Sequence, residues 1–524
     1  MINYFRILLF ALFLFCTEFL AAQHQNILIS EANEPNEPAI IIDPNNTNRM
    51  VAATNLSNYY TSADGGLTWT ENVATSTYGV WGDPVVSVDA NGNFYYFHLS
   101  HHRGGNWIDR IVCQKSTDGG LTWSDGTFTG LNGTKAQDKH WVAMDHKKNA
   151  MYLTWTQFDA YGSHAPEDST IIRFSKSMDG GETWSDAIRI SELAGNCVDD
   201  DSTVEGAVPC IGPNGEIYVS WAGPAGIVFD KSLDGGETWL KNDIPVDPMP
   251  GGWNYIIPGI QRSNGMPITT CDISGGKNHG TIYINWSDQR NGIEDTDVWL
   301  KKSTDGGRSW SELIRVNDDP AGKQQFFTWM AIDQTSGALY FVFYDRRNYK
   351  DENTDVFMAV SYDGGETFIN FKISESPFFP VDGIFFGDYT NISVHDNVIR
   401  PIWTRLDEGE LSIWTAIVQP HLITDVLKTE IADPGQHSLS QNFPNPFNKE
   451  TFISFKLHQS AKVTLKIIAI TGKRHVVIFS NKHFEMGKHI ESFDAKKYKL
   501  ASGNYFYVVE ADGQLMSKKM IVIK

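Results

Sequence analysis

The sequence SLDGGETW, residues 232–239, is one of six near copies of a single eight-residue pattern. The Asp of this pattern can accept hydrogen bonds from backbone N–H groups of its own turn, and the two glycines permit backbone conformations that a side chain would forbid. The closing aromatic residue is expected to pack into a sheet. A structure built of repeated β units follows. The other copies begin at Ser62, Ser116, Ser177, Ser303 and Ser361.

Short apolar segments separated by turn signals fill the space between the copies. Before Asp234 the sequence predicts strands at 207–212, 217–222 and 227–232, and a fourth strand begins at 238. Groups of a first, second and third strand occur seven times in the sequence. Only six fourth strands follow, one after each copy of the eight-residue pattern. Residues 26–31 resemble the other fourth strands, and we expect them to pair with 411–418 and close a ring that would otherwise have unpaired edges. The groups begin near Pro38, Pro84, Trp141, Ala207, Met266, Thr328 and Asn391.

The repeated motif is similar to the Asp box, and residues 25–418 resemble the sialidase-like propeller superfamily. The resemblance implies an all-β fold. The strand count predicts a seven-bladed β-propeller over residues 23–418, although sialidases with this motif have six blades. Residues of the box are structural in this superfamily. The box residues in this chain are Asp64, Asp118, Asp179, Asp234, Asp305 and Asp363.

Composition and charge restrict the partners of the chain. Its 524 residues include 63 Asp and Glu against 43 Lys and Arg, which gives a formal charge of −20 and argues against nucleic acid as a partner. Residues 1–22 have the layout of a cleavable signal peptide, with one basic residue before an apolar run. No other apolar run is long enough to predict a transmembrane segment. In an exported protein, Cys197 and Cys210 could close a short disulfide loop.

Three residues with reactive side chains occupy equivalent positions ahead of the first strands of three repeats. Asp138, Glu205 and Tyr389 each lie seven positions before the residue that closes the strand, so we expect them at one mouth of the channel. The resemblance to sialidases implies that Tyr389 is the nucleophile, Glu205 its base and Asp138 the acid/base. The leading interpretation is a sialidase-like glycoside hydrolase that acts on anionic glycans.

Sialidases also clamp the carboxylate of the substrate with three arginines. Arg290, Arg347 and Arg405 lie near the ends of second strands in three successive blades and are the candidates here. Asp297 and Asp355 recur at matching offsets, which favours structural ion pairs for Arg290 and Arg347. Arg405 has no such partner in the sequence and is the better candidate for binding an anion.

Other features leave alternative functions open. Trp253 could stack on a sugar ring, as it would in a non-catalytic propeller that binds glycans or proteins. His140 could contact the substrate or serve as the base of a polysaccharide lyase. No cofactor is expected, although the acidic runs at 199–201 and 351–355 could coordinate structural calcium.

The end of the chain has a different character. Residues 419–436 are expected to form a polar linker, and residues 437–524, with 14 Lys and Arg against 6 Asp and Glu, are predicted to form a small β-sandwich. The segments NFPNPFN (442–448), LASGNYFYVVE (500–510) and KKMIVIK (518–524) resemble the C-terminal sorting domain of type IX secretion. The resemblance implies the type IX machinery as a partner and a secreted or cell-surface location, attached to the outer membrane.

Overall fold

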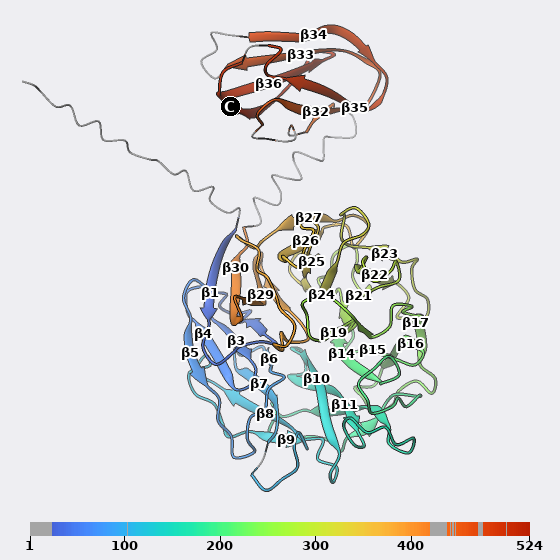
Figure 1. Cartoon of the computed structure of the whole chain (residues 1–524). Coiled ribbons are helices and arrows are strands. Elements are labelled where there is room, and N and C mark those ends of the chain that lie inside the picture. Colours follow the sequence, from blue (N-terminus) through green and yellow to red (C-terminus); the bar gives the residue numbers. More distant parts are fainter. Residues whose placement is uncertain are drawn as a thin grey trace, which may run out of the picture. The chain divides into compact units, whose positions relative to one another are not determined.

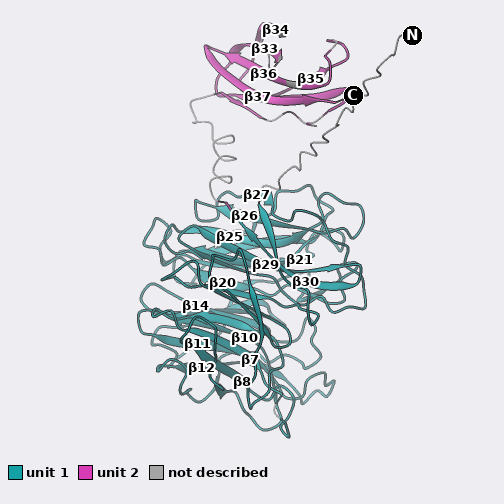
Figure 2. Ribbon diagram, turned by 90° about the vertical axis from the view of Figure 1, so that its left-hand side faces the viewer, with its two compact units in different colours: residues 1–418 teal, residues 419–524 magenta. Residues whose placement is uncertain are grey.

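The computed structural model describes residues 24–523 apart from 102, 420–436, 441, 443, 444, 446, 470–474 and 499. These described residues form 37 strands and no helix, which confirms the predicted all-β class. None of them belongs to a helix able to span a membrane. Two compact units meet in the sequence after Val418 (Figure 2), and each is described by itself. The predicted signal peptide, 1–22, and the linker beyond Gln419 lie outside the described residues.

The described residues of the first unit form seven four-stranded antiparallel sheets (Figure 1). The first sheet contains β2 (Ala39–Ile42), β3 (Met50–Thr54), β4 (Asn58–Ser62) and β5 (Thr70–Val73). The second contains β6 (Val85–Val88), β7 (Phe94–Leu99), β8 (Ile111–Ser116) and β9 (Thr127–Thr129). The third contains β10 (Ala136–Asp145), β11 (Ala150–Phe158), β12 (Thr170–Ser177) and β13 (Ile188–Arg189).

The next three sheets repeat this meander. The fourth contains β14 (Glu205–Ile211), β15 (Ile217–Gly223), β16 (Gly226–Ser232) and β17 (Ile244–Asp247). After a small hairpin of β18 (Asn254–Tyr255) and β19 (Ser263–Asn264), the fifth contains β20 (Ile268–Cys271), β21 (Ile282–Asp288), β22 (Asp297–Ser303) and β23 (Ile314–Arg315). The sixth contains β24 (Gln325–Asp333), β25 (Ala338–Asp345), β26 (Asp355–Ser361) and β27 (Ile369–Lys372).

The seventh sheet joins the two ends of the unit. It contains β28 (Asn391–His395), β29 (Val398–Asp407), β30 (Glu410–Ile417) and the N-terminal strand β1 (Gln25–Ser30). β1 pairs antiparallel with β30, with Gln25 opposite Ile417 and Leu28 opposite Trp414. The predicted pairing of the N-terminal segment with the last sheet is therefore confirmed.

Neighbouring sheets contact one another through their first strands. β2 contacts β6, β6 contacts β10, and the series continues through β14, β20, β24 and β28. β28 in turn contacts β2, so the seven first strands form a closed cycle. Figure 1 shows the sheets following one another around this centre. Closure leaves no first strand without a neighbour, which removes the hazard of an open end.

Four of the second strands each bury a tryptophan. Trp155 in β11, Trp221 in β15, Trp286 in β21 and Trp403 in β29 are all fully buried. Two of these indoles still find an acceptor, because buried N–H groups are costly without one. The Nε1 of Trp155 donates to Gln137, and that of Trp286 donates to Asp288.

The Asp boxes form the turns that the sequence predicts. In the box of Asp234, Oδ1 accepts hydrogen bonds from the backbone N of Thr238 (2.9 Å) and from Ser232 Oγ (2.8 Å). Hydrogen bonds from Thr238, with its hydroxyl first, lower the pKa of Asp234 to about 2. Gly236 has φ +86°, and a Cβ there would lie 2.4 Å from the ring of Phe174, so only glycine fits.

The second unit has two sheets. One is formed by β31 (Ser438–Leu439), β32 (Glu450–Leu457) and β35 (Gly487–Asp494). The other is formed by β34 (His475–Phe484), β33 (Ala461–Ala469), β36 (Gly503–Ala511) and β37 (Gln514–Val522). Side chains of both sheets share one buried apolar cluster, which includes Phe455 and Tyr507. This unit therefore has a core of its own.

The four described cysteines are all free. Cys113, Cys197 and Cys271 are buried, and Cys210 is partly buried. The disulfide between Cys197 and Cys210 that the sequence suggested is thus not formed.

Candidate active site

The backbone is strained where several first strands begin. Glu37, Asp83, Lys139 and Phe327 have φ values of 49°, 49°, 48° and 49°, in the left-handed region that side chains disfavour. Glu37 and Asp83 precede β2 and β6, whereas Lys139 and Phe327 lie within irregular starts of β10 and β24. Such strain concentrates at functional sites, and three of these four residues line one pocket.

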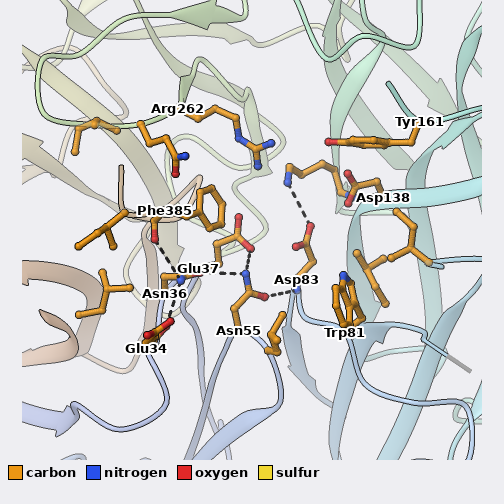
Figure 3. Close-up of a pocket in the computed structure, with 18 of the residues that line it drawn as sticks. Glu34, Asn36, Glu37, Asn55, Trp81, Asp83, Asp138, Tyr161, Arg262 and Phe385 are labelled. Carbon is orange, nitrogen blue, oxygen red and sulfur yellow. Dashed lines mark hydrogen bonds and ion pairs between the residues drawn. The ribbon is translucent and has the colours of Figure 1, made fainter. Parts of the chain in front are cut away.

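This pocket has a volume of about 890 Å³, which suits an oligosaccharide-sized or drug-sized ligand. Acidic and basic groups at its base come from the starts of first strands, and Trp81, Trp107 and Tyr161 supply aromatic surface. The hairpin of β18 and β19 contributes Arg262 and the exposed side chain of Ile256. Figure 3 shows Arg262, Glu37, Asp83 and Asp138 around the same space.

Lys139 is the buried cation at the base of the pocket. Its side chain is 7% exposed, and Nζ lies 2.8 Å from Asp388 and 3.4 Å from Asp83. Burial disfavours the charged amine, but Asp388 and Asp83 outweigh burial and raise the pKa of Lys139 well above its usual value. Lys139 is therefore charged at neutral pH.

Arg262 bridges two acids from different parts of the chain. Its Nε donates to Asp388 (2.9 Å), its Nη1 donates to Asp199 (3.1 Å), and its guanidinium lies 5.1 Å from the ring centre of Phe385. The charge of Asp388, more than the opposing effect of burial, raises the pKa of Arg262. Burial would raise the pKa of Asp388, but Arg262 and Lys139 lower it below the usual range. Asp388 is thus an ionised anchor for both cations.

Glu37 and Asp83 form a coupled pair of carboxyl groups. Burial and the charge of Asp83 raise the pKa of Glu37 well above its usual value. Burial would also raise the pKa of Asp83, yet Lys139 and a hydrogen bond with Glu37 lower it. Asn55 holds this pair in place, because its Nδ2 donates to Glu37 and its Oδ1 accepts from the backbone N of Asp83 at 2.7 Å. Glu37 is therefore the protonated member and Asp83 the ionised one.

Asp138 lines the same pocket, and its pKa is shifted in the opposite direction to that of Asp83. Burial, opposed by Lys139 and reinforced by Asp83 and Asp199, raises the pKa of Asp138 to about 7. Tyr161 lies over this region: its hydroxyl donates to Asp199 (3.2 Å), and its ring packs edge-on against Trp107 at 5.4 Å. One pocket thus contains a carboxyl group that can deliver a proton near neutral pH and another that stays ionised.

Glu205 and Tyr389 do not line this pocket. Glu205 is fully buried, and burial together with Asp199 and Asp138 raises its pKa well above the usual value. Tyr389 is 3% exposed and packs against Trp141 at 5.2 Å. Burial and then the charges of Glu37, Asp83 and Asp388, counteracted by Lys139, raise its pKa. The acids that raise the pKa of Tyr389 are therefore not the acids that raise the pKa of Glu205.

The three candidate arginines also lie away from the pocket lining. Arg290 binds Asp288 and Asp247 (2.8 Å) rather than Asp297. Arg347 binds Asp345 (2.8 Å) and lies 2.5 Å from Asp318 rather than pairing with Asp355. The structural ion pairs expected for these arginines are thus present, but with different partners, because the acids that end the same strands lie nearer.

Arg405 is packed into the seventh sheet. Its guanidinium lies 5.2 Å from the ring centre of Trp414 and donates to Ser376 (3.2 Å) and to the carbonyl of Pro377 (3.1 Å). Asp407 lies 3.5 Å away, so a carboxylate partner does exist. The side chain is 10% exposed. Its geometry is that of a packed structural arginine.

The remaining sequence candidates are buried. His140 is 1% exposed, and burial lowers its pKa to about 4, so it is neutral at pH 7. Trp253 is 4% exposed and packs against Gly206, where a Cβ would come within 2.9 Å of its ring. Among the described residues, no cluster of His, Cys, Asp and Glu has the geometry of a metal site.

Four residues that matter most to the pocket were not singled out from the sequence. Glu37 and Asp83 each precede a proline at the start of a first strand. This repeated acid–proline pair could have identified both residues from the sequence. Lys139 follows Asp138 directly, within the segment already identified. Arg262 lies in the insertion between the fourth and fifth sheets, where no repeat or motif marks it.

Comparison with protein families identifies the second unit, with its two-sheet core. Residues 441–524 match the secretion system C-terminal sorting domain. This sorting domain indicates a secreted or cell-surface protein that engages the type IX secretion machinery. No curated protein matches the chain.

Deleting the sorting domain should separate export from folding. A chain that ends at residue 436 retains the first unit with its complete buried core, so we expect its Tm for that unit to change by less than about 2 °C. The same chain should remain inside the producing cell, which fractionation and immunoblotting would show. Equal export of the truncated and full chains would contradict this assignment.

Several solved structures share a distant likeness to the chain. The sialidase of Trypanosoma rangeli is 11% identical, with 95% of this chain and 89% of that chain covered and a TM-score of 0.43. The intramolecular trans-sialidase from Ruminococcus gnavus is 12% identical, with 66% and 96% covered and a TM-score of 0.43. A protein of unknown function from Dyadobacter fermentans is 12% identical, with 75% and 96% covered and a TM-score of 0.42. This level of similarity assigns neither an activity nor a catalytic residue to the chain.

Proposed function

We propose that the chain is an exported glycoside hydrolase in which Asp138 is the general acid. The observation that carries this proposal is the opposed behaviour of Asp138 and Asp83 in one pocket: the pKa of Asp138 is raised to about 7, whereas that of Asp83 is lowered. Two carboxyl groups whose surroundings push their pKa values apart are the usual basis of acid catalysis at a glycosidic bond.

The roles of the two carboxyl groups follow from their protonation. Asp138 would donate its proton to the oxygen of the leaving sugar as the bond between that oxygen and the anomeric carbon breaks. Asp83, ionised beside Lys139, would stabilise the positive charge that develops on the sugar ring. A water molecule would then attack the anomeric carbon and lose a proton, which restores the proton of Asp138. Tyr389 and Glu205, the nucleophile and base implied by the sialidase resemblance, are buried outside the pocket and take no part in this proposal.

Aromatic side chains support a sugar ligand. Trp107 is 42% exposed and Trp81 and Tyr161 are partly exposed, and all three line the pocket. Flat aromatic faces fit the C–H surface of pyranose rings, while the exposed amides of Asn254 and Gln261 offer donors and acceptors to hydroxyl groups. The pocket therefore has both kinds of surface that a glycan needs.

The proposed architecture extends the observed topology. We propose that the seven sheets are the blades of a seven-bladed β-propeller over residues 23–418, which supports the pocket at the centre of the closed cycle. Residues 1–22 are proposed as a signal peptide, 419–436 as a linker, and 437–524 as a β-sandwich sorting domain attached to the outer membrane.

A screen of oligosaccharides tests the activity. The purified full chain is incubated with neutral, carboxylated, sulfated and amino oligosaccharides, and reducing ends and unsaturated products are measured separately. New reducing ends without unsaturation support hydrolysis. Unsaturated products would show that the protein is a polysaccharide lyase instead. Tight binding without any product would favour a propeller that binds glycans without catalysis.

A further inference from the structure

The charge of the pocket is the feature that the proposed hydrolase leaves unexplained. Glu34, Glu37, Asp83 and Asp138 line the pocket, and its lining contains only two cations among the described residues, Lys139 and Arg262. Sialidase-like recognition of an anionic sugar needs cations that are free to bind it. In this pocket both cations are bound by acids of the protein itself.

Neither cation is available to an incoming anion. Lys139 is already paired with Asp388 and Asp83, and Arg262 with Asp388 and Asp199. The two positive charges are thus paired with three carboxylates, because Asp388 binds both Lys139 and Arg262. The other acids of the pocket, Glu34 at the exposed edge and Asp138 beside Tyr161, have no cation of their own at that distance.

The buried acid Glu37 adds no negative charge to the pocket, because it is the protonated member of the pair with Asp83. Its side chain is 1% exposed, and Oε1 accepts no hydrogen bond from the described residues. Figure 3 shows its carboxyl group beside Asp83, facing the same space as the Arg262 guanidinium. The free carboxyl group of the pocket is therefore that of Glu34 at its exposed edge.

We propose that the pocket selects a glycan with a free amino group, a glucosamine-type oligosaccharide, rather than a carboxylated glycan. This inference rests on the proposed function in that it assigns the substrate class of the same pocket. A protonated amine would interact with Glu34 and with the acids that outnumber the two cations, and could also lie against the faces of Trp81, Trp107 or Tyr161. A sugar carboxylate would meet net negative charge in a partly enclosed space, where Coulomb repulsion is weakly screened.

The test compares three oligosaccharides of equal length by calorimetry with the full chain. These probes are a glucosamine oligomer, its fully N-acetylated counterpart and a galacturonate oligomer, at a pH where the amines are protonated. We expect the glucosamine oligomer to bind at least about tenfold more tightly than the N-acetylated one, and this preference to weaken as salt is raised. The galacturonate oligomer should bind weakest of the three.

Variants show whether the preference arises in the pocket. Glu34→Gln should lower the preference for the glucosamine oligomer about threefold, because it removes one partly screened charge at the pocket edge. Glu237→Gln, which alters an exposed acid in an Asp-box turn, is the matched control and should leave the preference unchanged. Equal or tighter binding of the galacturonate oligomer, or no binding of any probe, would overturn the inference.

Binding and turnover separate this inference from the proposed function. A preference for the amino oligomer without any hydrolysis would reject the hydrolase and leave the ligand class standing. Hydrolysis confined to carboxylated oligomers would reject the ligand class and leave the hydrolase standing.

Discussion

Asp138→Asn is expected to lower the turnover of the true substrate about 10³-fold, within the range that general acid catalysis contributes. The amide keeps the size and most of the polarity of the side chain, and Asp138 is 6% exposed within a strand, so the fold should persist. KM should change little, because the lost proton transfer occurs only in the transition state. Steady-state kinetics with reducing-end detection measures both quantities.

The pH profile provides a second readout of the same assignment. The wild-type rate should fall as pH rises through about 7, because Asp138 then loses the proton that it must donate. Asp138→Asn should remove this decline. Asp230→Asn is the matched control: burial raises the pKa of Asp230 to about 7 as well, but this residue lies outside the pocket. Full activity of Asp138→Asn would exclude the residue as the acid.

Lys139→Met should lower the free energy of unfolding by about 3–5 kcal/mol at neutral pH, because it leaves buried carboxylates without their cation. Asp83 loses its nearest positive charge, whereas Asp388 keeps Arg262. The folded-state pKa values of both acids are lowered in the wild type, so their stabilising contribution is present above the unfolded pKa and is lost as pH falls through the folded values. The deficit of Lys139→Met should therefore shrink toward acid pH.

Urea unfolding at neutral and acid pH measures this deficit. Lys148→Met is the control, since Lys148 is 45% exposed and lies 3.8 Å from Asp145, and such surface pairs contribute less than about 1 kcal/mol. A neutral-pH loss no larger than that of the control would show that the acids around Lys139 are not held by its charge.

The repeats and the ring closure were predictable because they depend on local chemistry and on pairing rules. The Asp of each box accepts hydrogen bonds from residues of the same turn. The eight residues around Asp234 therefore specify their own local structure. The strand predicted at residues 26–31 could complete only the last sheet, which otherwise lacked a fourth strand. In the structure β1 does pair with β30.

The pocket was predictable only in part, because burial by the rest of the fold decides which of the aligned side chains reach it. Seven-residue spacing placed Asp138, Glu205 and Tyr389 at one register, but only Asp138 lines the pocket. Register shifts lie between Asp138 and Trp141 in β10 and between Glu205 and Val208 in β14. These shifts lie at the same offset from Asp138 and Glu205, so the two residues differ in how they are covered rather than in register: Glu205 is fully buried, whereas Asp138 is 6% exposed.

The sequence by itself determined the all-β repeat, the Asp-box turns, the strand that joins the two ends of the first unit, and the sorting domain, since each is encoded by residues close together or by a repeated pattern. Only the tertiary structure decided the chemistry of the pocket. Asp388, Arg262, Lys139 and Asp83 come from four different parts of the chain and meet only after the first strands close their cycle. Their protonation depends on burial and on each other's charges, and both are properties of the folded state.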